Sequence, residues 1–196
     1  MSAQTVPYLT PQEYLEIEEK ADYKSEYFRG RMWPLGGEPY GMAGGRAEHN
    51  LIAMNFTGEL RSALKGKCLV FNSDQRIRVS ADGLYTYADG SVVCGKPVLA
   101  EKHTLTNPRI IVEVLSKSTE SNDRGLKFAQ YVKLESLEEY VLVSQTEPRV
   151  ERYRRQPHGA WLWREYTGLN AAVELESVEC AVAMSEIYAG VEFEEG

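Results

Sequence analysis

The 196-residue sequence predicts an α+β fold, in which helices flank a mixed β-sheet core and an antiparallel β extension follows toward the C-terminus. Apolar residues recur every four positions at Ile52, Phe56, Leu60 and Leu64, which is typical of the buried face of a helix. From residue 149 onward, short segments alternate polar and apolar residues between turns, which is typical of half-buried antiparallel strands. The predicted helices and strands do not alternate regularly, so a purely parallel sheet is not expected.

The length fits a single domain over residues 1–196. We divide it into an N-terminal helix, hairpin and long helix (10–66), a core (67–145), and a C-terminal β meander with a short helix (146–196). No apolar run approaches the roughly 20 residues that span a bilayer. The first residues have neither a basic start nor an apolar core, so no signal peptide is predicted.

The three cysteines, Cys68, Cys94 and Cys180, are scattered and odd in number. They form no CxxC pair, so we expect neither a disulfide framework nor a zinc site. Together with the missing signal peptide, this predicts a cytoplasmic protein in a reducing environment.

The formal net charge of −7 argues against broad, non-specific binding of nucleic acid, which depends on Lys and Arg neutralising phosphates. It leaves room for a local basic cleft, or for a cation that bridges acids to phosphates. One short stretch is rich in arginine, and we interpret it as the solvated face of a strand, with a basic patch as the alternative: Arg149, Arg152, Arg154 and Arg155.

The first elements follow from capping and turn signals. Thr10, Pro11 and Glu13 predict a helix start with a capping box. Residues 26–29 and 31–35 predict a hairpin whose turn is Arg29-Gly30. A glycine-rich loop over 36–45 leads into a helix of about 18 residues that ends near Lys65-Gly66.

The middle of the chain predicts mostly strands. Short strands are expected over 68–71 and 75–79, a turn at Asp82-Gly83, and one strand over 85–94. After a polar loop over 96–106, the central strand runs over 109–115, a helix capped by Asn122 or Asp123 runs to about Lys133, and a buried strand covers 139–144. The segments RVERYRR, AWLWREYT and AAVELES then predict a meander, followed by a short helix over 185–190.

Glu113 interrupts the apolar run of the central strand. Alternation places Ile111, Glu113 and Leu115 on one face, while apolar residues also fill the other, so the strand is expected inside the sheet. An unpaired carboxylate in an apolar interior is unfavourable. Glu113 is therefore either an acid at the strand end that is held by an arginine or a metal ligand, and the second interpretation is favoured.

Asp89 is the second candidate acid, although its Asp-Gly dipeptide is also typical of an ordinary turn. Two acids on neighbouring strands can share one hard cation. Mg²⁺ suits such a pair, because it takes one or two carboxylates and completes its shell with water and phosphate oxygens.

Lys127, Gln130 and Tyr131 share one face of the helix that follows the central strand, because they are three and four positions apart. A lysine beside a metal-bound water can orient it and stabilise developing negative charge. A plain surface lysine is the alternative. Packing of this helix against the sheet is expected from its apolar residues: Leu126, Phe128, Ala129 and Val132.

Other polar and aromatic residues carry weaker signals. His49, at the start of the long helix, fits a structural histidine, with a role beside an acid or a phosphate as the alternative. Asp74 fits a turn acid as well as a ligand. Core packing or a subunit interface suits the three tryptophans better than base stacking: Trp33, Trp161 and Trp163.

An Asp, a Glu on the next strand and a nearby Lys resemble the PD-(D/E)XK nuclease motif. More closely, nearly the whole chain resembles the Uma-two family of restriction endonucleases. The matching segments occur in the family's order: LTPQEYLEIE, YKSEYFRGRM, the His49-Asn50 helix, SDQRIRV, YADGSVVCG, NPRIIVEVLSKST, the helix over 123–131, SLEEYVLVSQ, PRVERYRR and SEIYAGV. The resemblance implies a restriction-endonuclease-like fold.

The resemblance also implies roles for particular residues. Asp89 resembles the first acid of the motif, Glu113 the second, and Glu26 an additional metal ligand, while Lys127 resembles a catalytic lysine supplied by the helix. Two positions depart from the motif: the proline before the first acid is Ala88 here, and the lysine two residues after Glu113 is Leu115. Lys117 is a second candidate for the missing lysine, and His49 and Gln130 are auxiliary candidates.

The function implied is that of an endonuclease that hydrolyses phosphodiester bonds in DNA with Mg²⁺ or Mn²⁺ and a metal-activated water. The alternative is a catalytically impaired protein of the same fold that binds nucleic acid or acts in regulation. A homodimer is expected in either case, with the tryptophan-bearing meander as its edge.

Overall fold

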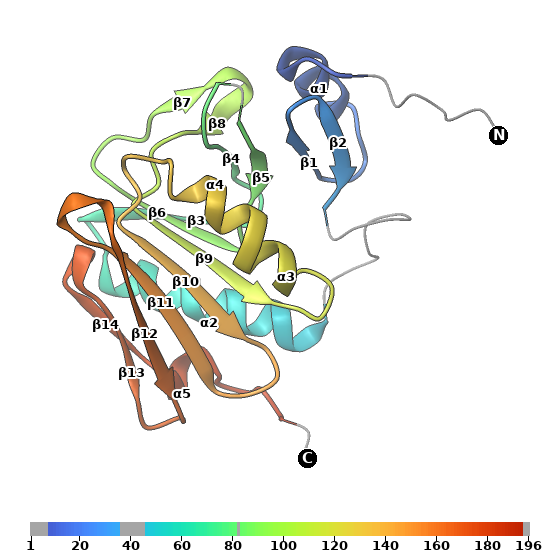
Figure 1. Ribbon diagram of the computed structural model, residues 1–196. Coiled ribbons are helices and arrows are strands. Elements are labelled where there is room, and N and C mark those ends of the chain that lie inside the picture. Colours follow the sequence, from blue (N-terminus) through green and yellow to red (C-terminus); the bar gives the residue numbers. More distant parts are fainter. Residues whose placement is uncertain (1–7, 36–45, 82, 194–196) are drawn as a thin grey trace.

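The computed structural model describes residues 8–35, 46–81 and 83–193. It is built on two six-stranded sheets and a small two-stranded sheet, with few helices (Figure 1). This mixed α+β architecture is consistent with a restriction-endonuclease-like fold, so the predicted fold class is confirmed. The predicted glycine-rich loop over 36–45 and Asp82 of the predicted turn lie outside the described residues.

The first sheet has the strand order β2-β1-β5-β4-β8-β7. Its strands are β1 (Ser25–Phe28), β2 (Arg31–Pro34), β4 (Arg76–Arg78), β5 (Tyr85–Tyr87), β7 (Leu99–Ala100) and β8 (Thr104–Leu105). Strands β1 and β2 form the predicted hairpin, with Arg29 and Gly30 both at positive φ in its turn. Such a turn matches the twist of paired strands, and glycine adopts this conformation readily.

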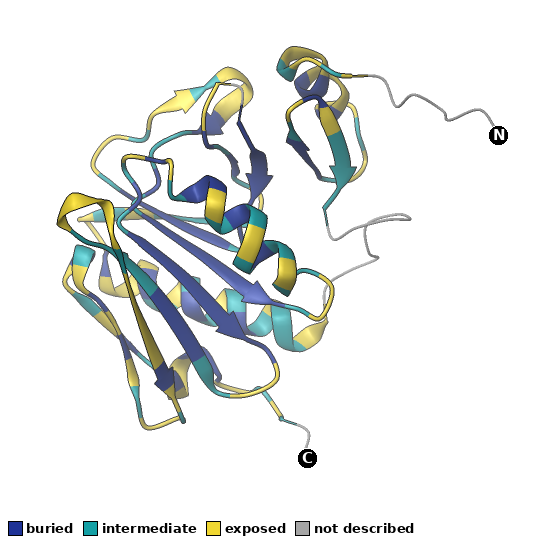
Figure 2. Cartoon of the chain, in the orientation of Figure 1, coloured by how far each residue is buried: buried dark blue, intermediate teal, exposed yellow. Residues whose placement is uncertain are grey.

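The second sheet has the order β12-β11-β10-β9-β6-β3. Its strands are β3 (Cys68–Asn72), β6 (Gly90–Cys94), β9 (Ile110–Leu115), β10 (Glu139–Ser144), β11 (Arg149–Arg155) and β12 (Trp161–Thr167). Only β9 and β10 are parallel neighbours here. Both are buried along their whole length, whereas the edge strand β12 is largely exposed (Figure 2). The predicted central position of residues 109–115 is therefore confirmed.

Helices cover both faces of the second sheet (Figure 1). On one face, α2 (Ala47–Ala63) packs its predicted stripe, together with α5 (Met184–Ile187) and the hairpin of β13 (Ala172–Leu175) and β14 (Cys180–Ala183). On the other face lies a helical segment made of α3 (Glu120–Asn122), a π-helical turn (Asp123–Lys127) and α4 (Phe128–Tyr131). The N-terminal helix α1 (Pro11–Glu18) has the predicted capping box and packs on the first sheet.

Three predictions about elements were wrong. The single strand over 85–94 is two strands in different sheets, because the chain leaves the first sheet after Tyr87 and enters the second at Gly90. The polar loop over 96–106 contains β7, β8 and a 3-10 turn over Glu101–His103. The helix after the central strand begins at Glu120, so neither Asn122 nor Asp123 caps it.

The expectation of no disulfide was also wrong. Cys68 and Cys94 are directly opposite in the antiparallel pair β3–β6, with Cα atoms 4.1 Å apart, and they form a disulfide. The two residues are 26 positions apart in the sequence, so their spacing alone gave no signal. Cys180 is a free thiol.

The arginine-rich stretch is not a solvated face, so that interpretation was wrong. Arg152 is fully buried and lies 3.4 Å from Glu139. Arg155 donates to three backbone carbonyls and stacks over Trp161. The remaining two arginines form ion pairs with glutamates, Arg149 with Glu147, Glu151 and Glu165, and Arg154 with Glu176. In the part of the chain that is described, no helix is long and apolar enough to cross a membrane.

Candidate active site

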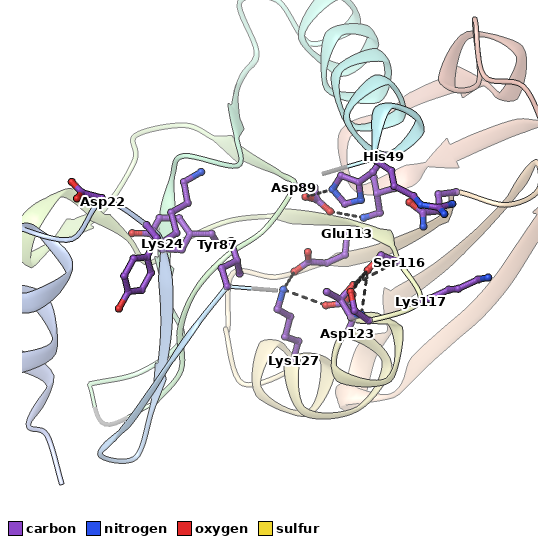
Figure 3. A pocket seen from close by; sticks show the side chains of 17 residues that line it. Asp22, Lys24, His49, Tyr87, Asp89, Glu113, Ser116, Lys117, Asp123 and Lys127 are labelled. Carbon is purple, nitrogen blue, oxygen red and sulfur yellow. Dashed lines mark hydrogen bonds and ion pairs between the residues drawn. The ribbon is translucent and has the colours of Figure 1, made fainter. Parts of the chain in front are cut away.

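A cavity of about 800 Å³ opens where the two six-stranded sheets approach one another. Its wall includes side chains from the segment after β9, from the start of α2 and from the residues that directly precede β1. Acidic residues and one lysine gather inside it: Asp89, Glu113, Asp123 and Lys127 (Figure 3). This volume lies within the range of ligand-binding pockets, roughly 300–1,000 Å³.

Lys127 is the centre of this group. Its side chain is buried, with 5% of the residue exposed, and its Nζ lies 3.1 Å from Glu113 Oε1, 3.2 Å from Asp123 Oδ1 and 3.5 Å from Glu26 Oε1. Three carboxylates therefore surround one ammonium group in a site that is almost closed to solvent. The prediction of a plain surface lysine is excluded, because a surface side chain would be exposed.

Glu113 reaches the cavity from the middle of the second sheet. It is 3% exposed, and its Oε1 accepts hydrogen bonds from Lys127 Nζ and from Tyr131 Oη at 2.9 Å. Both donors come from the helical segment that covers this face of β9. Glu113 is thus held by a cation, although this is Lys127 and not the expected arginine, and it also faces a cavity, as a metal ligand would.

Glu26 reaches Lys127 from the other sheet. Its position in the middle of β1 gives it a neighbour on each side: Trp33 Nε1 on β2 donates to Oε2 at 2.8 Å, and Thr86 Oγ1 on β5 donates to Oε1 at 2.5 Å. Both oxygens of this carboxylate therefore accept protein hydrogen bonds. Through Glu26 and Glu113, Lys127 joins the first sheet to the second.

Asp89 occupies the point at which the chain passes from one sheet to the other. Its Oδ2 accepts a hydrogen bond from the backbone N–H of Val114 at 2.7 Å, and its Oδ1 lies 3.0 Å from His49 Nε2 at the start of α2. The next residue, Gly90, permits this close approach, since a Cβ there would lie 2.7 Å from Thr57 Cγ2 of the same helix. His49 therefore orients Asp89, which is the alternative role considered for it.

The helical segment turns polar side chains toward the sheet, and beside them Phe128, one of the apolar residues expected to pack there, stacks on Tyr140 of β10. Asp123, Lys127 and Tyr131 are buried, while Ala129 is exposed and Leu126 is half-buried. Asp123 and Tyr131 were not recognised as site residues from the sequence. The available signal was their spacing, because each lies four positions from Lys127 and so shares its helix face.

Burial and charge shift the proton equilibria of this cluster. Burial raises the pKa of Glu113 well above its ordinary value, and the negative charges of Asp123 and Asp89 add to this, while Lys127 acts in the opposite direction. Burial likewise raises the pKa of Asp123. Burial lowers the pKa of Lys127, but the surrounding acids outweigh it, so that pKa is raised. The cluster therefore keeps its ammonium charged and disfavours ionisation of every acid at once.

Two predicted residues stand apart from this group. Gln130 is buried, but its Oε1 accepts a hydrogen bond from Lys133, and it does not line the cavity. Asp74 pairs with Lys24 at 2.6 Å and is largely exposed, so it acts as a turn acid and not as a ligand. Lys117 lines the cavity on the loop after β9, and Leu115 faces the apolar core, where a strand lysine would otherwise stand.

Asp89 and Glu113 are the two carboxylates of the site that could hold a hard divalent cation. Both carboxylates face the same cavity, and the acids of the cluster outnumber its cationic side chains. Over the described ranges, no group of three or more His, Cys, Asp or Glu is arranged to hold a metal. Two carboxylates are nevertheless sufficient for Mg²⁺, which takes its remaining ligands from water and phosphate oxygens.

Comparisons with known proteins show to which family the chain belongs. The chain is 36% identical over 188 residues to the uncharacterized protein slr1290 of Synechocystis sp. strain PCC 6803, an alignment that covers 95% of each chain. It is 34% identical over 177 residues to the uncharacterized protein sll1609 of the same organism, covering 89% of this chain and 96% of that one. A family model described as "Putative restriction endonuclease" matches residues 11–185, and the chain therefore belongs to this family, Uma2.

Proposed function

We propose that this protein is an endonuclease that hydrolyses phosphodiester bonds in DNA and uses Mg²⁺ or Mn²⁺. The observation that carries the proposal is the buried Lys127, which shares one cavity with Glu113, Asp123 and Asp89. Membership of a restriction endonuclease family supports the same class of reaction. Acids that outnumber the cations beside a cavity are unfavourable without a ligand, and a cation with its phosphate would offset them.

The divalent cation would be held by Asp89 and Glu113, and when bound it supplies an activated water and screens the charge of the phosphate. The protein groups then have separate tasks. His49 and the Val114 N–H fix the two oxygens of Asp89. Tyr131 and Lys127 fix Glu113 through its Oε1.

Lys127 has a further task in this proposal. Its ammonium stays charged among the acids, so it is available to hydrogen-bond the attacking water and to neutralise charge that develops on the phosphate oxygens. A lysine from the helix then does what a strand lysine would do at Leu115. Glu26 holds Lys127 in place from the first sheet, and we assign it this positioning role in preference to metal ligation, because Glu26 does not line the cavity that Asp89 and Glu113 face.

A second candidate is a non-catalytic protein that binds nucleic acid or acts in regulation as a homodimer. Leu115 in the usual lysine position and the engaged oxygens of Glu26 favour it. It predicts DNA binding without turnover under any divalent ion. The first candidate predicts turnover that depends on both Glu113 and Lys127.

The test is cleavage of plasmid and oligonucleotide DNA by the full-length protein with Mg²⁺ or Mn²⁺, compared with excess EDTA. Glu113→Gln and Asp89→Asn keep the shape of each side chain and should reduce the rate by at least a hundredfold. Glu165→Gln, on the edge strand β12, is a matched control that should leave the rate unchanged. Cleavage that persists in Glu113→Gln would remove that residue from the mechanism and the proposal with it.

A further inference from the structure

We infer that the cavity takes a single strand of DNA and excludes an intact duplex, an inference that rests on the proposed function and names the substrate of the same site. The first reason is depth. The central groups of the site are almost closed off from solvent, with exposures of 3% for Glu113, 2% for Asp123 and 5% for Lys127. A phosphate must enter the cavity to reach them.

A flexible single strand can place one phosphate in such a recess, because its bases are free to turn aside. In a duplex, each phosphate is held on a rigid cylinder with the partner strand beside it, and one helical turn is about 34 Å long. The cavity, at about 800 Å³, has the size of a small-ligand site and cannot surround such a cylinder.

The second reason is the charge around the mouth of the cavity. Besides Lys127 and His49, three basic residues line the cavity, and in Figure 3 Lys24 and Lys117 lie on opposite sides of the acidic side chains, while Arg46 precedes α2. Lys24 is already paired with Asp74. The side chains of Arg46 and Lys117 form no ion pair or hydrogen bond with any residue in the described ranges, so these side chains are free to meet phosphates.

The unpaired basic side chains at the cavity are few for a protein that binds duplex DNA. Binding to duplex DNA rests on many phosphate contacts, whereas this chain carries a net charge of −7 and offers two unpaired cations at the cavity. Two cations on either side of a recess suit a short run of backbone that crosses it. They are too few to compensate the approach of two phosphate backbones to the acidic cluster.

The third reason is an aromatic ring beside the basic residue Lys24. Tyr23 lines the cavity, is 51% exposed, and makes no ring contact or hydrogen bond with another described residue. Exposed aromatic rings beside a basic groove are the usual platforms on which unpaired bases stack. A paired base is already stacked in its duplex and cannot use such a ring. Tyr23 therefore favours a strand with free bases.

The inference is tested by fluorescence anisotropy with one labelled oligodeoxynucleotide, used either alone or annealed to its complement. The full-length Glu113→Gln variant serves as the binding protein, so that cleavage does not interfere. We expect the single strand to bind at least ten times more tightly than the duplex at the same salt concentration. Added to this variant, Tyr23→Ala should weaken single-strand binding between about 5-fold and 100-fold.

Matched controls separate these contacts from general effects. Tyr8→Ala removes an exposed ring outside the cavity and should leave the dissociation constant unchanged. Lys117→Ala should reduce the slope of log affinity against log salt by about 0.7, the value for one single-strand phosphate, whereas Lys96→Ala should not. Duplex binding as tight as single-strand binding, or a Tyr23→Ala variant that binds normally, would overturn the inference.

Cleavage by the wild-type protein with Mg²⁺ distinguishes this inference from the function on which it rests. Equal cleavage of single-stranded and duplex DNA would overturn the inference and leave the endonuclease assignment standing. Cleavage of neither, with the binding preference retained, would overturn the endonuclease assignment and support the second candidate. Preferential cleavage of the single strand supports both.

Discussion

Two ionic clusters, each built around a buried cation, lie on opposite faces of the second sheet, and they differ in charge balance. The Lys127 cluster joins one cation to three carboxylates: Glu26, Glu113 and Asp123. The Arg152 cluster, on the face that α2 covers, joins two cations to two carboxylates: Arg152, Arg154, Glu139 and Glu176. The first opens into a cavity, whereas the side chains of the second do not line it.

The difference separates structural from functional ion pairs in this molecule. In the Arg152 cluster, Glu139 also accepts from Ser177 Oγ at 2.5 Å, and Arg152 donates to the Glu174 carbonyl at 2.5 Å. Such a balanced and hydrogen-bonded cluster can exist without a ligand. The Lys127 cluster carries surplus acid in a site of low polarity, which folding alone does not require. Burial by itself is therefore a poor guide to function, and unbalanced charge beside a cavity is a better one.

The largest effect is expected when the central cation of either cluster, Arg152 or Lys127, is removed. Arg152→Met leaves the buried Glu139 without its nearest cation, so we expect the free energy of unfolding to fall by about 3–5 kcal/mol. Activity per folded molecule should stay near that of the wild type, since Arg152 does not line the cavity. Lys127→Met should instead abolish cleavage. Urea unfolding and a cleavage assay on the folded fraction measure both.

The pH dependence of unfolding gives this comparison a control. In Lys127→Met, three acids lose their common cation, so stability should fall steadily as pH rises and the acids must ionise. In Arg152→Met, one of the two carboxylates, Glu176, is partly exposed and can be hydrated, so the fall with pH should be shallower. Identical pH profiles for the two variants would show that the clusters do not differ in charge balance.

Divalent ions should act on one cluster only. A ligand that binds the folded state alone stabilises it by about 2.7 kcal/mol when its concentration is a hundred times its dissociation constant. We therefore expect Mg²⁺ to raise the unfolding temperature of the wild type and of Glu139→Gln, and not that of Asp89→Asn. Calorimetric titration of wild type against Asp89→Asn measures the same site directly, and equal heats for the two proteins would contradict a metal at Asp89.

The same amide substitution should have opposite consequences in the two clusters. Since burial raises the pKa of Glu113 above its unfolded value, the stability from this group is full below about 4.5 and is lost as pH rises through the folded pKa. Glu113→Gln has no carboxyl group to ionise, so it does not lose stability in this way as pH rises. At neutral pH we therefore expect its free energy of unfolding to lie within about 1 kcal/mol of the wild-type value or above it. In this variant Lys127 still forms ion pairs with two other carboxylates, those of Glu26 and Asp123.

Glu139→Gln, in contrast, leaves Arg152 with Glu176 as its remaining partner, and we expect a loss of about 1–3 kcal/mol. Burial also raises the pKa of Glu139, so part of this loss is offset as pH rises. Unfolding by urea at several pH values separates the two variants. A larger loss in Glu113→Gln than in Glu139→Gln would reverse the proposed distinction.

The sequence predicted the fold where hydrophobic pattern dominates. The stripe of α2, the buried strands β9 and β10, and the meander all follow from local periodicity. The break between β5 and β6 could not be predicted, because both segments are apolar and the change of sheet depends on tertiary pairing. The same reason applies to the disulfide, which depends on the register of β3 against β6.

The candidate site was predictable in its acids and not in its geometry. Glu113 was recognisable because it interrupts an apolar strand, and Lys127 through the resemblance of its helix. Asp123 was mistaken for a cap because Asp is common at helix starts, and the π-helical turn that carries it leaves no pattern in a short segment. The contacts of Glu26 with Trp33 and Thr86 required knowledge of which strands are neighbours.

The smallest expected effect concerns His49, which stands at the edge of the unbalanced cluster. Burial lowers the pKa of His49, but the hydrogen bond to Asp89 and the charges of Asp89 and Asp123 raise it more, so the pKa lies above its ordinary value of 6.5. A folded pKa above the unfolded one contributes stability that is full below about 6.5 and is lost as pH rises through the folded pKa.

We therefore expect His49→Gln to lower the free energy of unfolding by less than about 1 kcal/mol near pH 6, with the difference vanishing at pH values above the folded pKa. Cleavage should fall only modestly, because the Val114 N–H still holds Asp89. His158→Gln, on an exposed turn of the meander and outside the cavity, is a matched control that should leave cleavage unchanged. If the difference in the free energy of unfolding between wild type and His49→Gln stayed constant with pH, His49 would pack beside Asp89 without sharing a proton with it. The contact between His49 and Asp89 would then have a structural role, like the ion pairs of the Arg152 cluster.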